Sequence, residues 1–245
     1  MGQILAFVSG KGGTGKTSVC AAVASCLAAE GQQVLCIDCD LGLRNLDIAL
    51  GMTDAATIPF THLMLEYSEL YDIPKHDGIP NLSLLTAPVS SSAQTFSSGE
   101  FRDFLNELRV RYDYCLIDAP AGIGETFSAV CDAADRIFVV SGSDPASLRD
   151  AASVSALLSS RPSGAVKLII NRVSPKMIRS MKITLDDVMD LTGLPLLGIV
   201  PEDKAIPLAA TEGTALILYT GKGAARACLN IARRIQGQRV PLMRL

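Results

Sequence analysis

The sequence has no excess of basic charge. Its 22 Lys and Arg residues are outnumbered by 25 Asp and Glu residues, which gives a formal net charge of −3 at pH 7. Nucleic-acid binding depends largely on cationic side chains that neutralise phosphates. The charge balance therefore gives no support to a nucleic-acid-binding protein, and we expect no specific nucleic-acid partner.

Long apolar runs are also missing. No stretch reaches the roughly 18 residues that a membrane-spanning helix needs. The N-terminus has no basic region followed by an apolar run and a cleavage site, which are the marks of a secretory signal peptide. We therefore expect a cytoplasmic protein.

The cysteines and histidines form no pattern typical of a metal centre or a disulfide framework. The seven cysteines are odd in number and scattered, which indicates reduced thiols. Cys36 and Cys39 match C-x-x-C, but residues three apart on a strand point to opposite faces, so we expect both to pack in the core. The two histidines, His62 and His76, have no partner pattern for zinc or Ser–His catalysis, and we interpret both as surface loop residues.

What the chain does have is apolar material for one large core. Hydrophobic residues make up 49% of its 245 residues and charged residues only 19%, which excludes general disorder. No composition break marks a linker. We expect a single domain over residues 1–245, of which the last ~10 residues form a tail.

Short apolar runs alternate with helix-length segments. The run at 4–8 is followed by a glycine-rich stretch and an Ala-rich segment that Gly31 ends, which is the order strand, loop, helix. A hydroxyl residue followed three positions later by an acid marks helix starts at Ser97, Ser147 and Thr184. Further strands are expected at 34–37, 82–85, 114–117, 137–140, 168–170 and 196–200. This alternation predicts an α/β fold with a mostly parallel, twisted sheet and helices on both faces.

One segment matches G-x-x-x-x-G-K-[ST], the phosphate-binding loop of P-loop NTPases, in the required place between a strand and a helix. Its glycines let backbone N–H groups surround phosphate oxygens, and the helix start adds its positive dipole end. In this pattern Lys16 contacts the terminal phosphates and Thr17 binds Mg²⁺. The predicted nucleotide-binding residues of this loop are Gly10, Lys11, Gly12, Gly13, Thr14, Gly15, Lys16, Thr17 and Ser18.

A second lysine, Lys11, lies in the same loop. An exposed loop lysine is often simply solvated, but this one could reach developing negative charge on phosphate, either within its own subunit or from a facing one. Its spacing leaves these alternatives open.

Three carboxylates follow predicted strands. Asp38 and Asp40 come after 34–37, and Asp118 follows 114–117 in the manner of a Walker B site. The carboxyl ends of parallel strands gather ligands at one edge of a sheet. Mg²⁺ keeps several waters and needs only one or two carboxylates, so we expect Asp38 and Asp118 to contact it through water. Asp40 is the candidate for orienting the attacking water, because phosphoryl transfer depends on positioning and charge stabilisation.

Three segments together resemble the MinD branch of the MinD/ParA family of ATPases, which carry a deviant Walker A P-loop. They are K-G-G-T-G-K-T at 11–17, I-D-C-D-L-G-L-R-N-L-D at 37–47 and D-A-P-A-G-I-G at 118–124. Further matches lie at 147–150, 181–187, 198–203 and 232–243, so the likeness covers nearly the whole chain.

The resemblance implies an enzyme that binds Mg-ATP and hydrolyses ATP to ADP and phosphate. It implies an ATP-dependent homodimer with the nucleotides between the subunits, in which Lys11 is the signature lysine that acts across the interface. Lys11, Lys16 and Asp40 are then the catalytic residues. Hydrolysis would dissolve the dimer, and such a cycle places division sites or other cell structures through a protein partner or activator.

The resemblance also assigns mobile and base-binding segments. It implies that 38–47 behaves as switch I and 118–124 as switch II, with Asn45, Asp47, Pro120 and Gly122 as switch residues. Asn171 and Arg172 would contact adenine, and Pro201, Glu202 and Asp203 would close over the base.

One departure from the family concerns the membrane. MinD proteins end in a basic amphipathic helix that lies on the membrane, whereas this chain stops soon after Met243. Segment 223–235 has apolar residues at helical spacing with Arg226, Arg233 and Arg234 outside them, and we favour a last helix docked on the sheet. Direct membrane binding is therefore doubtful, and recruitment to the membrane periphery would need a partner.

Other members of the superfamily fit less well. An iron–sulfur reductase needs cysteines in loops, but Cys115 falls in a predicted strand and Cys131 on a predicted helix. A capsule-type tyrosine kinase needs a Tyr-rich tail, and a ParA-like DNA partitioner needs a basic surface. Two alternatives remain: a nucleotide-sensing interaction module with negligible hydrolysis, and a related family member that positions flagella or other cargo.

Overall fold

The computed structural model describes residues 1–40, 44–55, 57–65, 73–88, 96–162, 164–174 and 184–243. Parts of two segments that carry the family resemblance, 41–43 and 181–183, lie outside these described residues.

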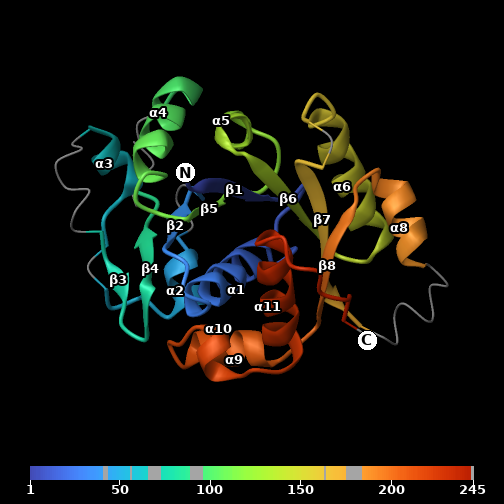
Figure 1. The fold of residues 1–245 in the computed structure, drawn as a ribbon. Coiled ribbons are helices and arrows are strands. Elements are labelled where there is room, and N and C mark those ends of the chain that lie inside the picture. The colour runs from blue at the N-terminus through green and yellow to red at the C-terminus, as the bar shows by residue number, and fades with distance from the viewer. Residues whose placement is uncertain are drawn as a thin grey trace.

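An eight-stranded sheet in the order β3-β4-β2-β5-β1-β6-β7-β8 forms the centre of the described chain (Figure 1). All neighbouring strands pair in parallel except β3 and β4, which pair antiparallel. The strands are β1 (Gln3–Val8), β2 (Val34–Asp38), β3 (Lys75–His76), β4 (Ile79–Leu85), β5 (Tyr114–Asp118), β6 (Arg136–Ser141), β7 (Val166–Val173) and β8 (Leu196–Pro201). All seven predicted strands are confirmed, and β3 is an addition.

Helices cover both faces of the sheet, as predicted (Figure 1). One face carries α3 (Phe60–Leu65), α4 (Ser98–Leu108), α5 (Glu125–Ala133), α6 (Pro145–Leu157) and α8 (Leu185–Thr192). The other face carries α1 (Lys16–Ala29), α2 (Leu46–Leu50), α9 (Ala205–Thr211), α10 (Leu216–Tyr219) and α11 (Gly223–Ile235). No helix among the described residues has the length and apolar character needed to cross a bilayer.

Each face has its own hydrophobic layer because successive strand residues point to opposite sides. In β1, Ile4 and Ala6 belong to the layer under α4, α5 and α6, whereas Leu5 and Phe7 belong to the layer under α1 and α11. A strand buried on both faces is apolar at every position, which is why these strands are visible as continuous apolar runs. Cys36 and Cys39 likewise fall in different layers, so the C-x-x-C pair does not form a site.

Helix α1 is buried around most of its surface, between the sheet and α11 (Figure 1). Its sequence K-T-S-V-C-A-A-V-A-S-C-L-A-A has almost no polar stripe, and a helix that is apolar all round is a buried helix. The small Ala side chains let α11 approach closely. This packing places the first turn of α1 at the carboxyl end of β1.

The capping predictions are confirmed for α4 and α8 and wrong for α6. Ser97 and Thr184 form capping boxes with Glu100 and Asp187. Ser147 lies inside α6 and is buried; the helix begins at Pro145, and Asp144 is the N-cap that accepts the N–H of Ser147 at 3.0 Å. A Pro at the first position favours this earlier start, because its missing N–H needs no partner there.

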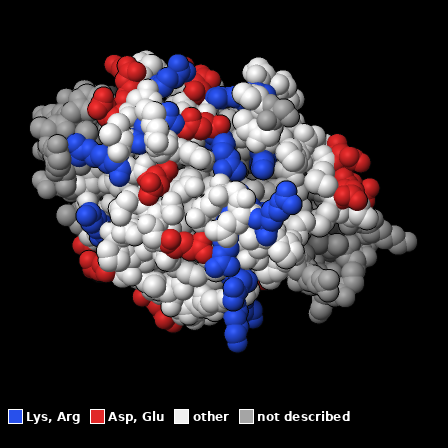
Figure 2. All heavy atoms as spheres, in the orientation of Figure 1, with Lys and Arg blue, Asp and Glu red and all other residues white. Residues whose placement is uncertain are grey.

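Helix α11 is docked on the molecule, as we favoured over a membrane helix. Seven of its residues are buried against α1 and β8: Ala224, Ala225, Ala227, Cys228, Ile231, Ala232 and Ile235. On the face shown in Figure 2, basic and acidic side chains are interspersed over the middle and the edges of the molecule. Two α11 arginines are engaged by the protein itself: Arg233 pairs with Glu30 at 2.7 Å, and Arg234 donates to the carbonyl of Leu197 at 2.9 Å.

Candidate functional site

The phosphate-binding loop runs from the end of β1 to the start of α1. Gly13 and Gly15 have φ of 81° and 83°, a left-handed conformation in which a Cβ is strained. A Cβ on Gly15 would also lie 2.3 Å from Nδ2 of Asn171, so only glycine fits. Gly15 is the N-cap of α1, and no side chain caps this helix end, which leaves it suited to bind an anion.

A cavity of about 410 Å³ lies in front of this loop. Ten of the predicted residues line it: Gly12, Gly13, Thr14, Gly15, Lys16, Thr17, Ser18, Asp40, Asn45 and Arg172. Five further residues that were not named as site residues also line it: Ser9, Ile48, Ala49, Ala121 and Ala210, of which Ala121 lies in the segment predicted to be switch II. The loop and both segments predicted to be switches therefore meet at one cavity.

Lys16, Thr17 and Asp118 form one contact group beside the cavity. The Nζ of Lys16 donates to Oδ1 of Asp118, and Oγ1 of Thr17 donates to Oδ2 of the same carboxylate at 2.6 Å. Lys16 and Asp118 are buried, with 6% and 1% of their surfaces exposed. Burial raises the pKa of Asp118, while the Lys16 ammonium and the Thr17 hydroxyl oppose this rise. Burying this ion pair is costly unless its groups are satisfied, as Asp118 is here.

Asp38 organises the segment that follows β2. Its carboxylate accepts backbone N–H groups of Asp40 at 2.9 Å, Asn45 at 3.3 Å and Leu46 at 3.2 Å. Burial and the nearby Asp118 raise the pKa of Asp38 to about 6, and the three N–H groups oppose the shift. Asp40 lines the cavity, and burial raises the pKa of its carboxyl, with Lys16 opposing the rise.

The donor set suits a hard cation such as Mg²⁺. The hydroxyl of Thr17 and the carboxylates of Asp38, Asp40 and Asp118 supply only oxygen atoms, which Mg²⁺ prefers. Within the described part of the chain, no group of three or more His, Cys, Asp or Glu side chains converges as a complete metal cage. Mg²⁺ is usually held by one or two protein groups together with water and phosphates, so these residues fit the ion.

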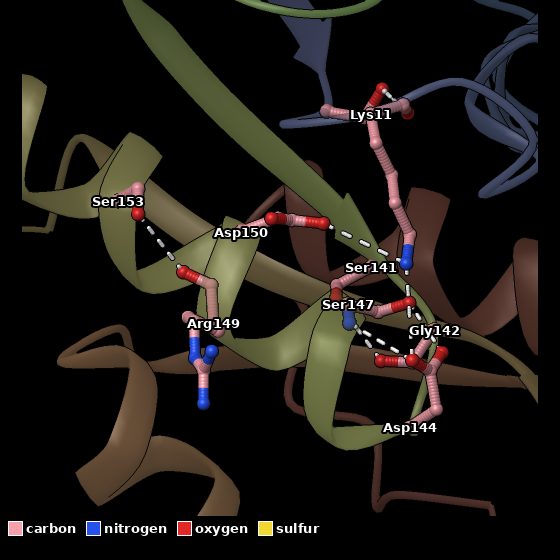
Figure 3. A network of polar contacts seen from close by, with 9 residues as sticks. Lys11, Ser141, Gly142, Asp144, Ser147, Arg149, Asp150 and Ser153 are labelled. Atoms are coloured by element: carbon pink, nitrogen blue, oxygen red, sulfur yellow. Dashed lines mark hydrogen bonds and ion pairs between the residues drawn. The ribbon is translucent and has the colours of Figure 1, made fainter.

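Lys11 does not line this cavity but turns toward α6 (Figure 3). Its Nζ lies 3.8 Å from Oδ1 of Asp144 and 3.6 Å from Oδ2 of Asp150, with roughly two-fifths of each side chain exposed. Asp144 is held in place by the N–H and hydroxyl of Ser147, and these bonds, with a smaller contribution from Lys11, lower its pKa. Gly10 lies tight against α6, since a Cβ there would be 2.9 Å from Cβ of Asp150.

Asn171 and Arg172 lie where β7 departs from regular pairing with β8. Nδ2 of Asn171 donates to the carbonyl of Thr14 at 2.8 Å, while its Oδ1 is buried with no hydrogen-bond partner among the described residues. Arg172 has φ of 54° and is the only non-glycine residue with positive φ in the described ranges. Strained conformations of this kind cluster at ligand sites.

Pro201, Glu202 and Asp203 are not brought into the cavity. The N–H of Glu202 donates to the carbonyl of Val173 at 3.0 Å. The carboxylate of Asp203 accepts the N–H groups of Ala205 and Ala224, each at 2.9 Å. In this conformation Asp203 therefore holds the start of α11 rather than facing the nucleotide cavity.

The predicted switch residues have defined local contacts. Asn45 precedes α2, and Asp47 forms an ion pair with Arg44 at 2.7 Å. Pro120 follows β5, and the N–H of Gly122 donates to the carbonyl of Ser9 in the phosphate-binding loop at 3.2 Å, with φ of 86° at Gly122. Both segments are thus tied to the strand ends that carry the loop and Asp118.

Sequence reasoning missed two groups of site residues and misplaced one histidine. Ile48 and Ala210 bear no chemical signal and lie in different elements. Asp150 carried a helix-start signal only, and Asp144 was not singled out. His76 is not a surface loop residue: it lies in β3 with 7% of its surface exposed. His62 is exposed, as predicted, but lies in helix α3.

Comparison with known proteins gives a consistent result. Residues 5–217 match the family model described as "CobQ/CobB/MinD/ParA nucleotide binding domain". The septum site-determining protein MinD of Synechocystis is 33% identical over 99% of this chain and 92% of that protein, and MinD of Thermotoga maritima is 32% identical over 99% and 91%.

Solved structures agree. The MinC:MinD cell division protein complex of Aquifex aeolicus has a MinD-like chain with a TM-score of 0.89 and 30% identity over 99% of this chain and 98% of that one. MinD of Pyrococcus horikoshii, complexed with Mg-ADP, has a TM-score of 0.81 and 28% identity over 96% of both chains. With its phosphate-binding loop, strand-end carboxylates and full-length match, this chain belongs to the MinD/ParA family of P-loop nucleotide-binding proteins, in the MinD branch.

Proposed function

We propose that this protein is a Mg-ATP-dependent molecular switch that hydrolyses ATP, dimerises around the bound nucleotide and acts in placing the division site. The observation that carries the proposal is the single cavity at which the phosphate-binding loop, Lys16, Thr17 and Asp40 meet, with Asp118 directly behind them. It further rests on the single-domain organisation expected for residues 1–245.

ATP binding would replace the contacts of Lys16 and Thr17 to Asp118 with contacts to phosphate and Mg²⁺. The phosphates would lie against the glycine-rich loop and the uncapped start of α1, whose N–H groups favour anions. Lys16 now donates to Asp118, and its ammonium would turn to the terminal phosphates. Thr17 would likewise move from Asp118 to Mg²⁺.

Hydrolysis would depend on positioning more than on covalent chemistry. Thr17 would bind Mg²⁺ directly, and Asp38 and Asp118 would hold it through water. When bound, Mg²⁺ supplies positive charge beside the phosphate oxygens. Asp40 lines the cavity with its carboxylate half-buried, and it would orient the water that attacks the terminal phosphate.

Lys11 would complete the site from a second copy of the chain. In the isolated chain its ammonium is turned away from the cavity and lies between Asp144 and Asp150 (Figure 3). Exposed ion pairs of this kind are worth about 0–1 kcal/mol, so phosphate charge on a facing subunit can displace them. Asp144 and Asp150 would then lose their cation only in the dimer.

The base would be recognised beside Asn171. Its Nδ2 already donates to the Thr14 carbonyl. Its Oδ1 is buried without a hydrogen-bond partner among the described residues, so this oxygen is the atom left to accept a hydrogen bond from the base. An amino group, as on adenine, can donate to that oxygen, whereas the carbonyl that guanine has at the same ring position cannot. Arg172, at the cavity, would contact the same end of the nucleotide. Pro201, Glu202 and Asp203 would have to move to close over the base.

The cellular role follows from the relatives. Proteins similar over the full chain are described as septum site-determining proteins, and the Aquifex aeolicus MinD structure is a complex with MinC. We therefore propose a protein partner of the MinC kind for the ATP-bound dimer, with recruitment to the membrane periphery through a partner. ADP, as in the Pyrococcus horikoshii structure, would be the product state.

The test is the solution mass of the Asp40→Ala variant by light scattering, in Mg-ATP and separately in Mg-ADP. Loss of the water-orienting carboxylate should trap the ATP state, so we expect a dimer with ATP and a monomer with ADP. Asp54→Ala, which removes an exposed carboxylate from the same part of the chain, is the matched control and should turn over ATP as the wild type does. A variant that binds ATP but stays monomeric would favour the interaction-module alternative.

A further inference from the structure

The helix that forms one wall of the nucleotide cavity is too short to hold its own shape. Helix α2 has five residues, and isolated helices below about 12 residues are marginal in water. Yet Ile48 and Ala49 of α2, with Asn45 just before it, line the cavity. The position of this wall must therefore come from contacts to the rest of the protein.

Contacts hold α2 at both ends. At its start, the Asp38 carboxylate accepts the N–H groups of Asn45 and Leu46. At its end, the carbonyl of Leu50 accepts a hydrogen bond from Nε2 of His76 at 2.9 Å. Carbonyls in the last turn of a helix have no partner within the helix, so His76 satisfies a group that α2 cannot satisfy itself.

The imidazole of His76 makes two separable sets of contacts. Its Nδ1 accepts the N–H groups of Gly78 at 2.9 Å and Ile79 at 3.1 Å, which shape the turn between β3 and β4. A nitrogen that accepts cannot carry the proton of a neutral imidazole, so Nε2 is the protonated nitrogen and donates to Leu50. One side of the ring serves the hairpin and the other serves α2.

The same helix end is also closely packed against a second segment. Gly51, the C-cap of α2, has φ of 70°, and a Cβ there would lie 2.5 Å from the carbonyl oxygen of Gly213. Gly213 follows α9, whose Ala210 lines the cavity as well. The end of α2 thus packs against both the β3–β4 hairpin and the turn after α9, and His76 makes the hydrogen bond from the hairpin.

We propose that His76 is a positioning residue for the ATP site: by holding the Leu50 carbonyl, it keeps α2 in place as the wall that contacts the bound nucleotide. This inference rests on the proposed function, because ATP is taken as the ligand of the cavity. The residue touches no nucleotide itself and acts through α2.

Two substitutions separate the two sets of contacts. In His76→Asn the amide oxygen stands near the position of Nδ1 and can accept the Gly78 N–H, but the shorter side chain cannot reach Leu50. In His76→Gln the amide nitrogen stands near Nε2 and can still donate to Leu50, while the acceptor of the hairpin turn is lost. His62→Asn, the same change at the exposed histidine of α3, is the control.

The measurement is the dissociation constant of Mg-ATP by titration calorimetry, alongside the midpoint of urea unfolding. A net hydrogen bond is worth about 0.5–1.5 kcal/mol, so we expect His76→Asn to weaken ATP binding about three- to tenfold. His76→Gln and His62→Asn should bind ATP within about twofold of the wild type. His76→Gln should nevertheless unfold at lower urea, because it leaves two backbone N–H groups without their acceptor.

The outcomes distinguish a failure of the proposed function from a failure of the proposed role of His76. If the wild type binds no ATP, the proposed function fails before His76 is tested. If the wild type binds ATP and both His76 variants bind it equally well or equally poorly, the imidazole has no more than a structural role and the inference is overturned. Stronger binding by His76→Asn than by His76→Gln overturns it as well.

A measurement on the wild type keeps the proposal testable if a variant does not fold. The chain has only two histidines, so ¹⁵N-histidine NMR spectra are simple to assign with His62→Asn. We expect His76 to have a protonated Nε2 and an unprotonated Nδ1, and its Nε2 signal to shift when Mg-ATP is added. An Nδ1-protonated ring, or a signal that saturating ATP leaves unchanged, would contradict the coupling between His76 and the site.

Discussion

The ammonium nitrogen of Lys11 lies 3.6 Å from the Asp150 carboxylate of its own chain. This pair joins the phosphate-binding loop to α6, and Lys11 lies outside the cavity that residues 12–18 of the loop line. The proposed action of Lys11 in a facing subunit requires that the pair open, so the strength of the pair should control how readily the dimer forms.

Weakening the pair should favour the dimer. Asp150→Asn keeps the side-chain shape that packs on Gly10 but removes one of the two carboxylate charges that hold Lys11, leaving that of Asp144. Since each exposed pair is worth about 0–1 kcal/mol, the ATP-dependent dimer should form at a protein concentration about two- to fivefold lower. Light scattering over a concentration series measures this. Asp132→Asn, at another exposed acidic partner, is the control, and an unchanged or higher dimerisation concentration in Asp150→Asn would contradict the role of the pair.

The two lysines of the loop should separate binding from assembly. Lys16→Ala removes the cation in the cavity, and we expect ATP binding to be lost. Lys11→Ala removes a cation that does not line the cavity, so ATP affinity should stay within about twofold of the wild type while dimerisation and phosphate release are lost. Calorimetry, light scattering and a phosphate-release assay give the three readouts. Wild-type turnover in Lys11→Ala would refute a cross-subunit role.

Lys16→Ala should also make the stability of the nucleotide-free protein depend on pH. The variant leaves the buried Asp118 with only the Thr17 hydroxyl, and removing one partner of a buried ion pair costs about 3–5 kcal/mol. Burial raises the pKa of Asp118, and Lys16 opposes this rise, so in the variant the folded state takes up a proton more readily than the unfolded state does. The stability deficit is therefore largest above the folded-state pKa and shrinks as pH falls through it.

Urea unfolding of wild type and variant at pH 8 and pH 5.5 measures that deficit. Thr17→Val, which leaves the Lys16 contact to Asp118 in place, is the comparison and should show a smaller deficit. A deficit of equal size at both pH values would mean that Asp118 stays ionised without its lysine.

Asn171 should contribute both affinity and base selectivity. Asn171→Ala removes the bond from Nδ2 to the Thr14 carbonyl and the buried oxygen assigned to the base amino group. We expect ATP affinity to fall about tenfold, since each lost hydrogen bond is worth about 1 kcal/mol. The preference for ATP over GTP should fall with it. Calorimetric titration with both nucleotides tests this, and GTP serves as the internal control. If ATP affinity falls but the preference for ATP over GTP is unchanged, Asn171 only supports the loop and does not select the base.

The parts of the protein that were predictable are those whose physics is local. The phosphate-binding loop is contiguous, its glycines are required by backbone geometry at Gly13 and Gly15, and the strands are visible because both of their faces are buried. The start of α6 was misplaced because Asp144 and Ser147 are both good caps three residues apart, and the choice depended on Pro145.

The sequence by itself determined the fold class, the family and the position of the glycine-rich loop predicted to bind phosphate, because these depend on periodicity and on contiguous motifs. Only the tertiary structure decided that Lys11 turns to α6, that Asp203 holds the start of α11 and that His76 is buried against α2. Each of these is a contact between segments distant in the chain. Such contacts follow from how the helices and the β3–β4 hairpin pack around the sheet, and no pattern of neighbouring residues encodes them.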